Sequence, residues 1–364
     1  MLPALPEPLP PATGVKPCGQ WSVVVLADPE QPPADAALTG VEQVLGELGG
    51  LTRANDRLPA QSAGMLAGAL RPWRSYRLQS AAEPEQLYAQ VAPWIGQCEV
   101  VITASDAGQP HVPALEGFSL GCRARRRVQP LLRQASRQAF RHIGIIPPAS
   151  AQRACDAISD RMDRFAEGLG QEPRYHNRHH TVDTLLAIAS LLRVALQQGQ
   201  LGDHDAITCI IAMNGHDLLH DGTINRPGHH LETIAASAVG DIMHECGCAD
   251  DDIETVRAVI LATDPTRQQV LRLRNLTDPQ TRLAAMCLIA GDADLFASLL
   301  PGIGAQLSID LAAEWRAAQI SFPAMPDTPQ GRRGFLGSIP SMSDAGEVIG
   351  LSDIVRDQLA GLPP

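Results

Sequence analysis

The sequence predicts a mainly α-helical protein, in which a small α/β domain precedes a large all-helical domain. Residues 1–17 are rich in proline and alanine, a composition typical of a disordered tail. Residues 18–125 alternate β-branched apolar runs with helical patterns, which indicates an α/β domain. From residue 126 to residue 364, segments rich in alanine and leucine follow one another with helical spacing, so we expect an all-helical domain there.

The first domain is expected to contain two buried strands, at 21–26 and 98–103, with helical patterns between them around 36–48 and 84–94. We expect this domain to be regulatory or to form a homodimer. A basic run at 123–127 is more typical of a solvated hinge or a helix start than of a nucleic-acid patch. The helices expected beyond it include 184–196, 231–243 and 282–300.

Composition excludes several functional classes. The chain has 364 residues, 45% of them hydrophobic, and a net charge of −11, which argues against nonspecific binding to nucleic acid or to an anionic membrane. No stretch is long and apolar enough for a membrane span, and the opening residues lack the pattern of a signal peptide. The eight cysteines are scattered, as reduced thiols are. We therefore expect a cytoplasmic protein that acts on a small molecule.

The histidines are the most informative feature. Eight of the eleven lie between residues 175 and 230, and the densest runs are 175–183 and 216–225. Imidazoles and carboxylates together suit divalent zinc, manganese or iron. Because a metal-bound water loses its proton near neutral pH, these runs predict metal-assisted hydrolysis of a phosphate ester.

The spacing within the runs supports a shared site. His176 and His180 are four residues apart, as are His216 and His220, so on a helix each pair would lie on one face. Asp217 would turn about 100° from His216 on such a helix, but an adjacent His-Asp pair can still supply one site from a helix end.

Four motifs resemble those of the HD-type metal-dependent phosphohydrolases, and within them the class I 3′,5′-cyclic-nucleotide phosphodiesterases. Residues 175–183 resemble the family's Y-H-N-x-x-H-x-x-D, and residues 216–225 resemble its H-D-x-x-H-x-G-x-x-N. Residues 260–264 are similar to its I-L-A-T-D, and residues 293–295 to the A-D-[LI] that supplies the last metal carboxylate. The motifs occur in the family's order and cover about a third of the chain.

The resemblance implies hydrolysis of a cyclic nucleotide, such as cAMP, to the nucleoside 5′-monophosphate in signal transduction. It implies two divalent ions, the first Zn, Mn or Fe and the second Mg or Mn, bridged by a hydroxide that attacks phosphorus. Asp217 would touch both ions, and the full ligand set of the first ion would be His180, His216, Asp217 and Asp294.

The resemblance also implies roles beside the metals. His176 would be the general acid that protonates the departing 3′ oxygen. Four further residues would orient the ligands and the waters of the second ion: His220, Asn225, Thr263 and Asp264.

Alternatives remain for some of these residues. Asp292 lies two residues before Asp294, and on a helix their side chains diverge by about 200°, so we expect only one of them to face the metal. The resemblance of residues 293–295 to the family's motif favours Asp294. Asp183 and Glu232 are equally consistent with support of the metal shell and with charges on a helix face. The run 263–265 could merely end a helix, because proline disfavours helical geometry in the preceding residue.

The expected base-binding segment departs from the family. Residues 332–336 are similar to its Q-V-G-F-I, in which the glutamine hydrogen-bonds the purine and the phenylalanine clamps it. Phe335 matches the clamp, but Arg332 stands in place of the glutamine, and Gln330 could substitute only if the loop shifts. A base-binding Arg332 would favour guanine, which presents two acceptors; a solvated loop is the alternative.

Two alternative functions remain. One is another HD phosphohydrolase, such as a nucleotidase acting on a phosphomonoester, and the other is a ligand-sensing HD module without catalysis. The full ligand set together with a proton donor argues against the sensing module, and the resemblance to the Y-H-N and I-L-A-T-D elements favours the phosphodiesterase over a generic nucleotidase.

Overall fold

The computed structural model describes residues 19–27, 34–53, 73–80, 87, 90, 98–104, 118, 119, 122, 123, 125, 126, 129–226, 230–275 and 281–362. The chain divides into two compact units, one of Met1–Ala54 with Arg74–Gln109 and one of Asn55–Trp73 with Pro110–Pro364. In the described part of the chain no single helix has the length and apolar composition of a membrane span; only a bent pair, broken by 96°, meets both conditions together.

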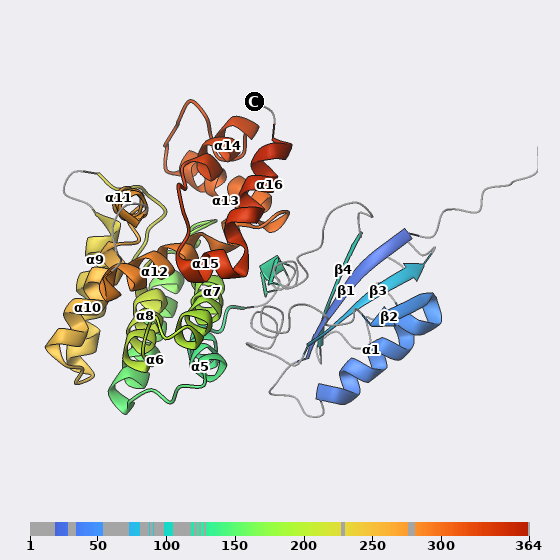
Figure 1. Cartoon of the computed structure of the whole chain (residues 1–364), viewed down its shortest axis with the longest axis horizontal. Helices are drawn as coiled ribbons and strands as arrows, with labels where there is room; N and C mark the ends of the chain where they lie inside the picture. Colours follow the sequence, from blue (N-terminus) through green and yellow to red (C-terminus); the bar gives the residue numbers. More distant parts are fainter. Residues whose placement is uncertain are drawn as a thin grey trace, which may run out of the picture. The chain divides into compact units, whose positions relative to one another are not determined.

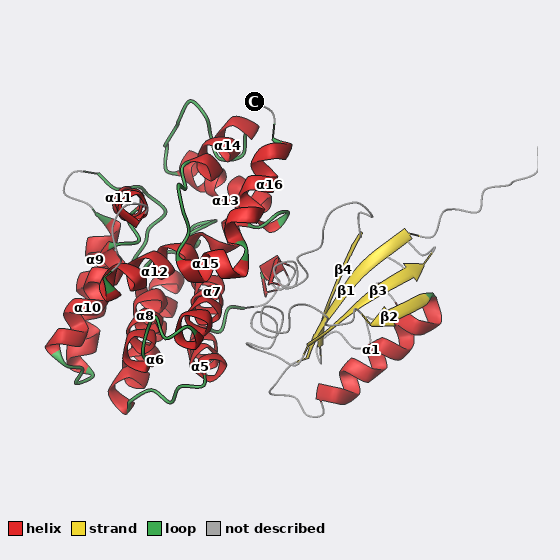
Figure 2. Ribbon diagram, in the orientation of Figure 1, coloured by secondary structure: helices red, strands yellow, loops and turns green. Residues whose placement is uncertain are grey.

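The first unit contains a four-stranded sheet with a helix along it (Figures 1 and 2). The strand order is β2-β3-β1-β4, and the pairs β1–β4 and β2–β3 are antiparallel. Helix α1 buries Val41 and Leu45, and strand β3 buries Tyr76 and Leu78, as expected for apolar faces packed together. The elements are β1 (Gly19–Ala27), α1 (Ala34–Leu48), β2 (Gly50–Arg53), β3 (Trp73–Ser80) and β4 (Cys98–Ala104).

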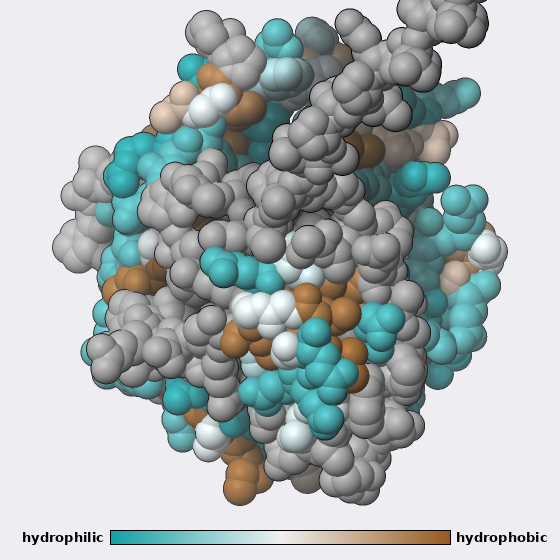
Figure 3. Space-filling view, turned by 90° about the vertical axis from the view of Figure 1, so that its right-hand side faces the viewer, coloured by the Kyte–Doolittle hydropathy of each residue, from teal (hydrophilic) through white to brown (hydrophobic). Residues whose placement is uncertain are grey.

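The predicted strands at 21–26 and 98–103 and the helix at 36–48 are confirmed by β1, β4 and α1. The sequence interpretation missed β2 and β3. The predicted tail 1–17 and most of the predicted helix 84–94 lie outside the described residues. On the face seen in Figure 3, brown hydrophobic residues lie beside teal hydrophilic ones among the coloured atoms.

The second unit is helical, as predicted, and its central helix α7 is buried on nearly all sides, which is the mark of a core helix. Helices α5, α8 and α12 pack against α7. The helices are α5 (Leu132–Ile143), α6 (Ala149–Gly168), α7 (Arg178–Gln197), α8 (Asp203–Gly215), α9 (Leu231–Glu245), α10 (Asp250–Leu261), α11 (Pro265–Asn275), α12 (Arg282–Leu299), α13 (Ile303–Ala317), α14 (Pro329–Gly337), α15 (Asp344–Ile349) and α16 (Leu351–Gly361).

The basic run at the start of this unit is not a solvated hinge. Arg125 donates to Oδ1 of Asp183 from Nε at 3.0 Å and from Nη2 at 2.7 Å, and Arg126 donates to Oδ2 at 2.7 Å. Asp183 is 1% exposed, and the two guanidinium groups outweigh the effect of burial, so its pKa lies well below the usual range. The Phe118 ring also packs on Phe296 of α12, with centroids 4.7 Å apart. Phe118, Arg125 and Arg126 therefore fasten the start of the unit to α7 and α12.

Candidate active site

His180 is held in position by the start of α7. The Asn177 side chain accepts hydrogen bonds from the backbone N–H groups of His179 (3.0 Å) and His180 (3.2 Å), which is the usual N-cap arrangement. Because the helix begins at Arg178, His176 precedes it in a bent segment, in which Asn177 N donates to Tyr175 O at 2.9 Å. The prediction that His176 and His180 share a helix face is therefore wrong; the cap and the turn before it bring the two rings together instead, with centroids 5.9 Å apart.

His216 and Asp217 lie where α8 ends. His216 is the C-cap residue, and the chain then turns through hydrogen bonds from Leu218 N to Gly215 O and from His220 N to Asp217 O, both 3.0 Å. Leu219 has a φ of 70°, a left-handed conformation that cannot continue a helix. The prediction that His216 and His220 share a helix face is therefore also wrong. The adjacent pair His216 and Asp217 lies at a helix end, as the alternative expected.

Four predicted ligands converge on one point. His180 Nε2 lies 3.0 Å from Asp294 Oδ1, 3.4 Å from Asp217 Oδ2 and 3.4 Å from His216 Nε2. His216 Nε2 lies 3.3 Å from Asp217 Oδ2 and 3.4 Å from Asp294 Oδ1. Four ligands at about 2.1 Å around one tetrahedral or octahedral ion lie roughly 3.0 to 3.4 Å from their neighbours. The spacing of this cluster is therefore that of ligands around one ion.

The chemistry of the donor atoms also fits a metal. Asp217 Oδ2 is buried without a hydrogen-bond partner, although a buried carboxylate oxygen normally has one. His216 Nδ1 lies 3.0 Å from Met213 O, so the proton on Nδ1 donates to that carbonyl and Nε2 offers its lone pair to the cluster. Burial alone would lower the pKa of His216, but the carboxylates of Asp217 and Asp294 raise it, which shows how strongly the cluster attracts positive charge. His180, His216 and Asp217 form a group able to hold a metal ion.

The structure separates Asp294 from Asp292. Asp292 is 0% exposed and accepts from Arg272 Nη1 at 2.7 Å, from Ser343 N at 2.8 Å and from Ser343 Oγ at 2.6 Å. Its two oxygens are thus occupied by a buried ion pair that joins α11, α12 and the loop before α15. Only Asp294, the residue favoured from the sequence, reaches His180.

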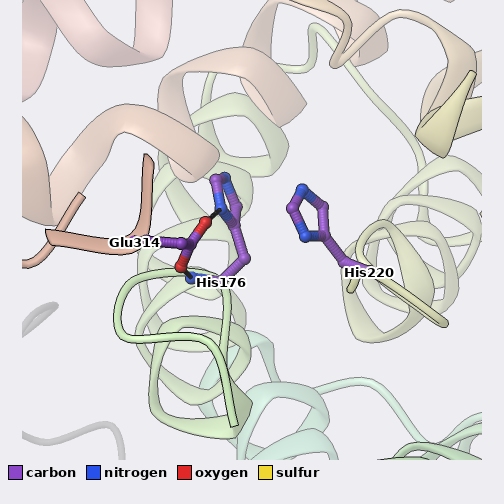
Figure 4. A group of neighbouring side chains, drawn as sticks. All are labelled: His176, His220 and Glu314. Atoms are coloured by element: carbon purple, nitrogen blue, oxygen red, sulfur yellow. Dashed lines mark hydrogen bonds and ion pairs between the residues drawn. The ribbon is translucent and has the colours of Figure 1, made fainter. Parts of the chain in front are cut away.

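His176 is paired with a carboxylate that sequence reasoning missed (Figure 4). Its Nδ1 lies 2.6 Å from Glu314 Oε1, and Glu314 Oε2 accepts from the backbone N–H groups of Tyr175 (2.7 Å) and His176 (3.0 Å). Burial opposes the charge on the imidazole, but Glu314 outweighs it and raises the pKa of His176 to about 9. His176 is therefore an imidazolium at neutral pH, oriented by Glu314.

His220 stacks on His176, with ring centroids 3.9 Å apart and planes 18° from parallel. Its Nδ1 accepts from Gly222 N at 3.1 Å, and burial together with the charge of His176 lowers its pKa to about 4. The group of His176, His220 and Glu314 also has the composition of a metal site. However, 2.6 Å between His176 Nδ1 and Glu314 Oε1 is a hydrogen-bond distance that leaves no room for an ion between them.

The other residues expected around the metals form a cluster of their own. Asn225 donates to Glu232 Oε2 at 2.7 Å and to Asp264 Oδ2 at 3.5 Å, and accepts from Leu231 N at 2.7 Å. The run 263–265 follows the end of α10 at Leu261, and Asp264 caps the start of α11 by accepting from Thr266 N at 2.8 Å. The buried Thr263 hydroxyl donates back to the Ile260 carbonyl.

A cavity of about 520 Å³ lies beside the site, and Tyr175 connects the two. Tyr175 lines the cavity, and its ring centroid lies 4.7 Å from that of His176 and 5.0 Å from that of His180. The cavity lining is largely apolar and aromatic, with two serines and one amide: Tyr175, Ser298, Leu307, Ser308, Leu311, Trp315, Phe322, Pro323, Ala324, Pro326, Gln330, Gly331, Gly334 and Phe335.

Arg332 does not belong to that lining, which corrects its predicted base-binding role. It is buried, and its guanidinium donates to Ser298 O at 2.6 Å and to Gln358 Oε1 at 2.7 Å. These bonds hold α14 against α12 and α16 and leave the group committed to the protein. Phe335 and Gln330 both lie on α14, and both line the cavity without a shift of residues 330–335.

No family model matches the chain, and no curated protein matches its sequence. Among solved structures, the chain is similar to the phosphodiesterase domain of the RhoPDE fusion protein from the choanoflagellate Salpingoeca rosetta. The identity is 18%, the TM-score is 0.49, and the match covers 71% of this chain and 92% of that one. We therefore base the function on the residues of the site.

Proposed function

We propose that this protein is a metal-dependent phosphodiesterase that hydrolyses a 3′,5′-cyclic nucleotide to the nucleoside 5′-monophosphate. The observation that carries the proposal is that two arrangements of side chains lie next to each other. One is a buried cluster with the spacing of metal ligands, and the other is a histidine kept protonated by a carboxylate. A metal cluster with an acid catalyst beside it suits a phosphate ester whose leaving oxygen needs a proton.

His180, His216, Asp217 and Asp294 would hold the first ion, and Asp217 would also contact a second. When bound, divalent ions would supply an activated water and neutralise charge on the phosphoryl oxygens. The side chains of Asp217 and Asp294 keep 17% and 23% of their surface exposed, whereas those of the two histidines keep 1–2%, so substrate would approach from the carboxylate side.

His176 would supply the proton to the departing 3′ oxygen. Because Nδ1 is bonded to Glu314, the proton on Nε2 is the one available to a substrate. Glu314 accepts three hydrogen bonds, which fix its orientation and, through it, that of the His176 ring. His220 stays neutral in the stack and does not compete as a cation.

The cavity supports a nucleotide as substrate. Its aromatic lining, including Tyr175, Trp315 and Phe335, suits the flat face of a nucleobase. Gln330 offers both a donor and an acceptor, which the edge of a purine needs. Tyr175 joins this cavity to His176 and His180, so base and phosphate would occupy neighbouring places.

The test compares His176→Ala with the matched control His204→Ala, a histidine whose side chain is 65% exposed on α8. Metal content and turnover would be measured on a panel of cyclic mononucleotides, nucleoside monophosphates and a bis(nitrophenyl) phosphate. We expect His176→Ala to keep its metal and to lose on the order of 10²- to 10⁴-fold in turnover of the cyclic nucleotide. The loss should be much smaller for the nitrophenyl ester, whose leaving group needs no proton, and His204→Ala should match the parent protein.

Equal losses on both substrates, or loss of metal with activity, would make His176 a structural residue. Turnover of nucleoside monophosphates without turnover of any cyclic nucleotide would favour the nucleotidase alternative.

A further inference from the structure

A second groove, unrelated to the site above, lies between α10, α11 and α12. Its volume is about 710 Å³, within the range typical of small-molecule pockets. Its lining is largely aliphatic: Ala258, Ala262, Thr266, Arg267, Val270, Leu271, Arg274, Asn275, Thr281, Leu283, Ala284, Cys287 and Leu288.

One face of α11 forms a wall of this groove. Arg267, Val270, Leu271 and Arg274 follow the spacing i, i+3, i+4, i+7, so the wall has an arginine at each end and an apolar centre. The two arginines are seven residues apart, roughly 10.5 Å along the helix. Val270 and, from α12, Leu283 remain 48% and 43% exposed although both line the groove.

The groove is a firm element of the fold. The Gln268 amide is buried and donates to Ala262 O at 2.7 Å and to Cys287 O at 2.8 Å, joining α11 to both neighbouring helices. The Arg272–Asp292 ion pair, one helical turn further along the same face of α11, also fixes α11 to α12. The groove therefore does not need a ligand to form, which reduces the cost of binding one.

The lining selects a narrow ligand chemistry. Among the described lining residues there are two arginines, no carboxylate and no aromatic ring, in a chain of net charge −11. Arginine favours a carboxylate, which it can bind with two parallel hydrogen bonds. The absence of rings from this lining argues against a flat aromatic ligand and for an alkyl chain. We propose that this groove binds a free fatty acid, its chain on Val270, Leu271 and Leu283 and its carboxylate at Arg267, because Arg274 already has an interaction partner within the chain.

This site does not depend on the proposed function, and a binding measurement tests it alone. Decanoate, decanol and decyltrimethylammonium, which share one chain length and differ in head-group charge, would each be titrated into the full-length protein by calorimetry. We expect saturable binding of decanoate at one site and much weaker binding of the other two.

The variants assign that binding to the groove. Arg267→Gln should weaken decanoate binding about 2- to 5-fold. Arg356→Gln, at an exposed arginine on α16, should leave it unchanged. Leu283→Glu should abolish decanoate binding. This variant should fold normally, because an acidic side chain is favourable in the first turn of α12. Thermal unfolding of each variant would verify the fold.

Four outcomes would overturn the proposal. Three of them are the absence of saturable decanoate binding, equal affinity for the three head groups, and decanoate binding that Leu283→Glu leaves intact. A fourth is a dimer that Leu283→Glu converts to a monomer and that decanoate does not dissociate, because a second copy of the chain would then cover the groove.

Discussion

Replacement of Glu314 by Gln tests whether a carboxylate keeps the acid catalyst protonated. Burial lowers the pKa of His176 and Glu314 raises it, for a net value of about 9 against an ordinary value of 6.5. The other charged groups near the ring are Asp217 and Asp294, which also raise the pKa, and His220 is neutral. In Glu314→Gln the pKa should fall to about 6.5, because the largest opposing charge is gone while Asp217 and Asp294 still offset burial.

The expected loss depends on pH with a definite sign. Because the pKa is raised, the imidazolium is present below about pH 9 in the parent protein and is lost as pH rises through that value. At pH 8 a group of pKa 9 is roughly 90% protonated and one of pKa 6.5 about 3%, so turnover should fall roughly 30-fold. At pH 6 the turnover of the two proteins should differ by less than about twofold, since His176 is then mostly protonated in both.

The assay is the pH profile of kcat for cyclic-nucleotide hydrolysis, with metal content measured at each pH. Glu254→Gln, at a glutamate 70% exposed on α10, serves as the matched control. A basic limb that stays in place in Glu314→Gln, or a loss that is the same at pH 6 and pH 8, would refute the role of Glu314.

Other predictions follow from the two aspartates, the buried arginine and the metals. Asp294→Asn should lose bound metal with little change in the free energy of unfolding; Asp292→Asn should keep its metal but lose about 3–5 kcal/mol, because Arg272 would keep a buried charge without its partner. Metal analysis and urea unfolding separate these two outcomes, and the reverse ranking would contradict the ligand set. Arg332→Ala should cost about 1–3 kcal/mol by leaving buried acceptors unpaired and should not change base preference, whereas Gln330→Ala should change it in a nucleotide panel. Thorough chelation should abolish turnover, and readdition of divalent metal should restore it.

The sequence could predict the ligand cluster because its members lie in short contiguous motifs. The choice of Asp294 over Asp292 followed from its neighbours alone, and its geometry in the structure agrees with it. The local backbone could not be predicted by periodicity, because histidines four residues apart fit a helix as well as a turn. Between His216 and His220, the left-handed conformation of Leu219 excludes a helix.

Residues that act through distant contacts could not be found this way. Glu314 is 138 residues from His176 and stands alone in a helix without a recognisable motif. Arg332 sits at a motif position, yet its burial depends on α12 and α16, which the motif does not encode. Strand β3 was within reach: Tyr76 and Leu78 alternate toward the core, but the arginines beside them weakened the apolar pattern.

The pairing of Asp183 with Arg125 and Arg126 determines where an independent catalytic fragment can begin. A fragment that starts after residue 126 would leave a carboxylate of 1% exposure without either cation, at a cost of about 3–5 kcal/mol. That is a large share of the stability of an ordinary domain, and the damage would fall on α7, one turn from His180. Truncations intended to isolate the enzyme should therefore retain the chain from before Phe118, where the aromatic contact with α12 begins.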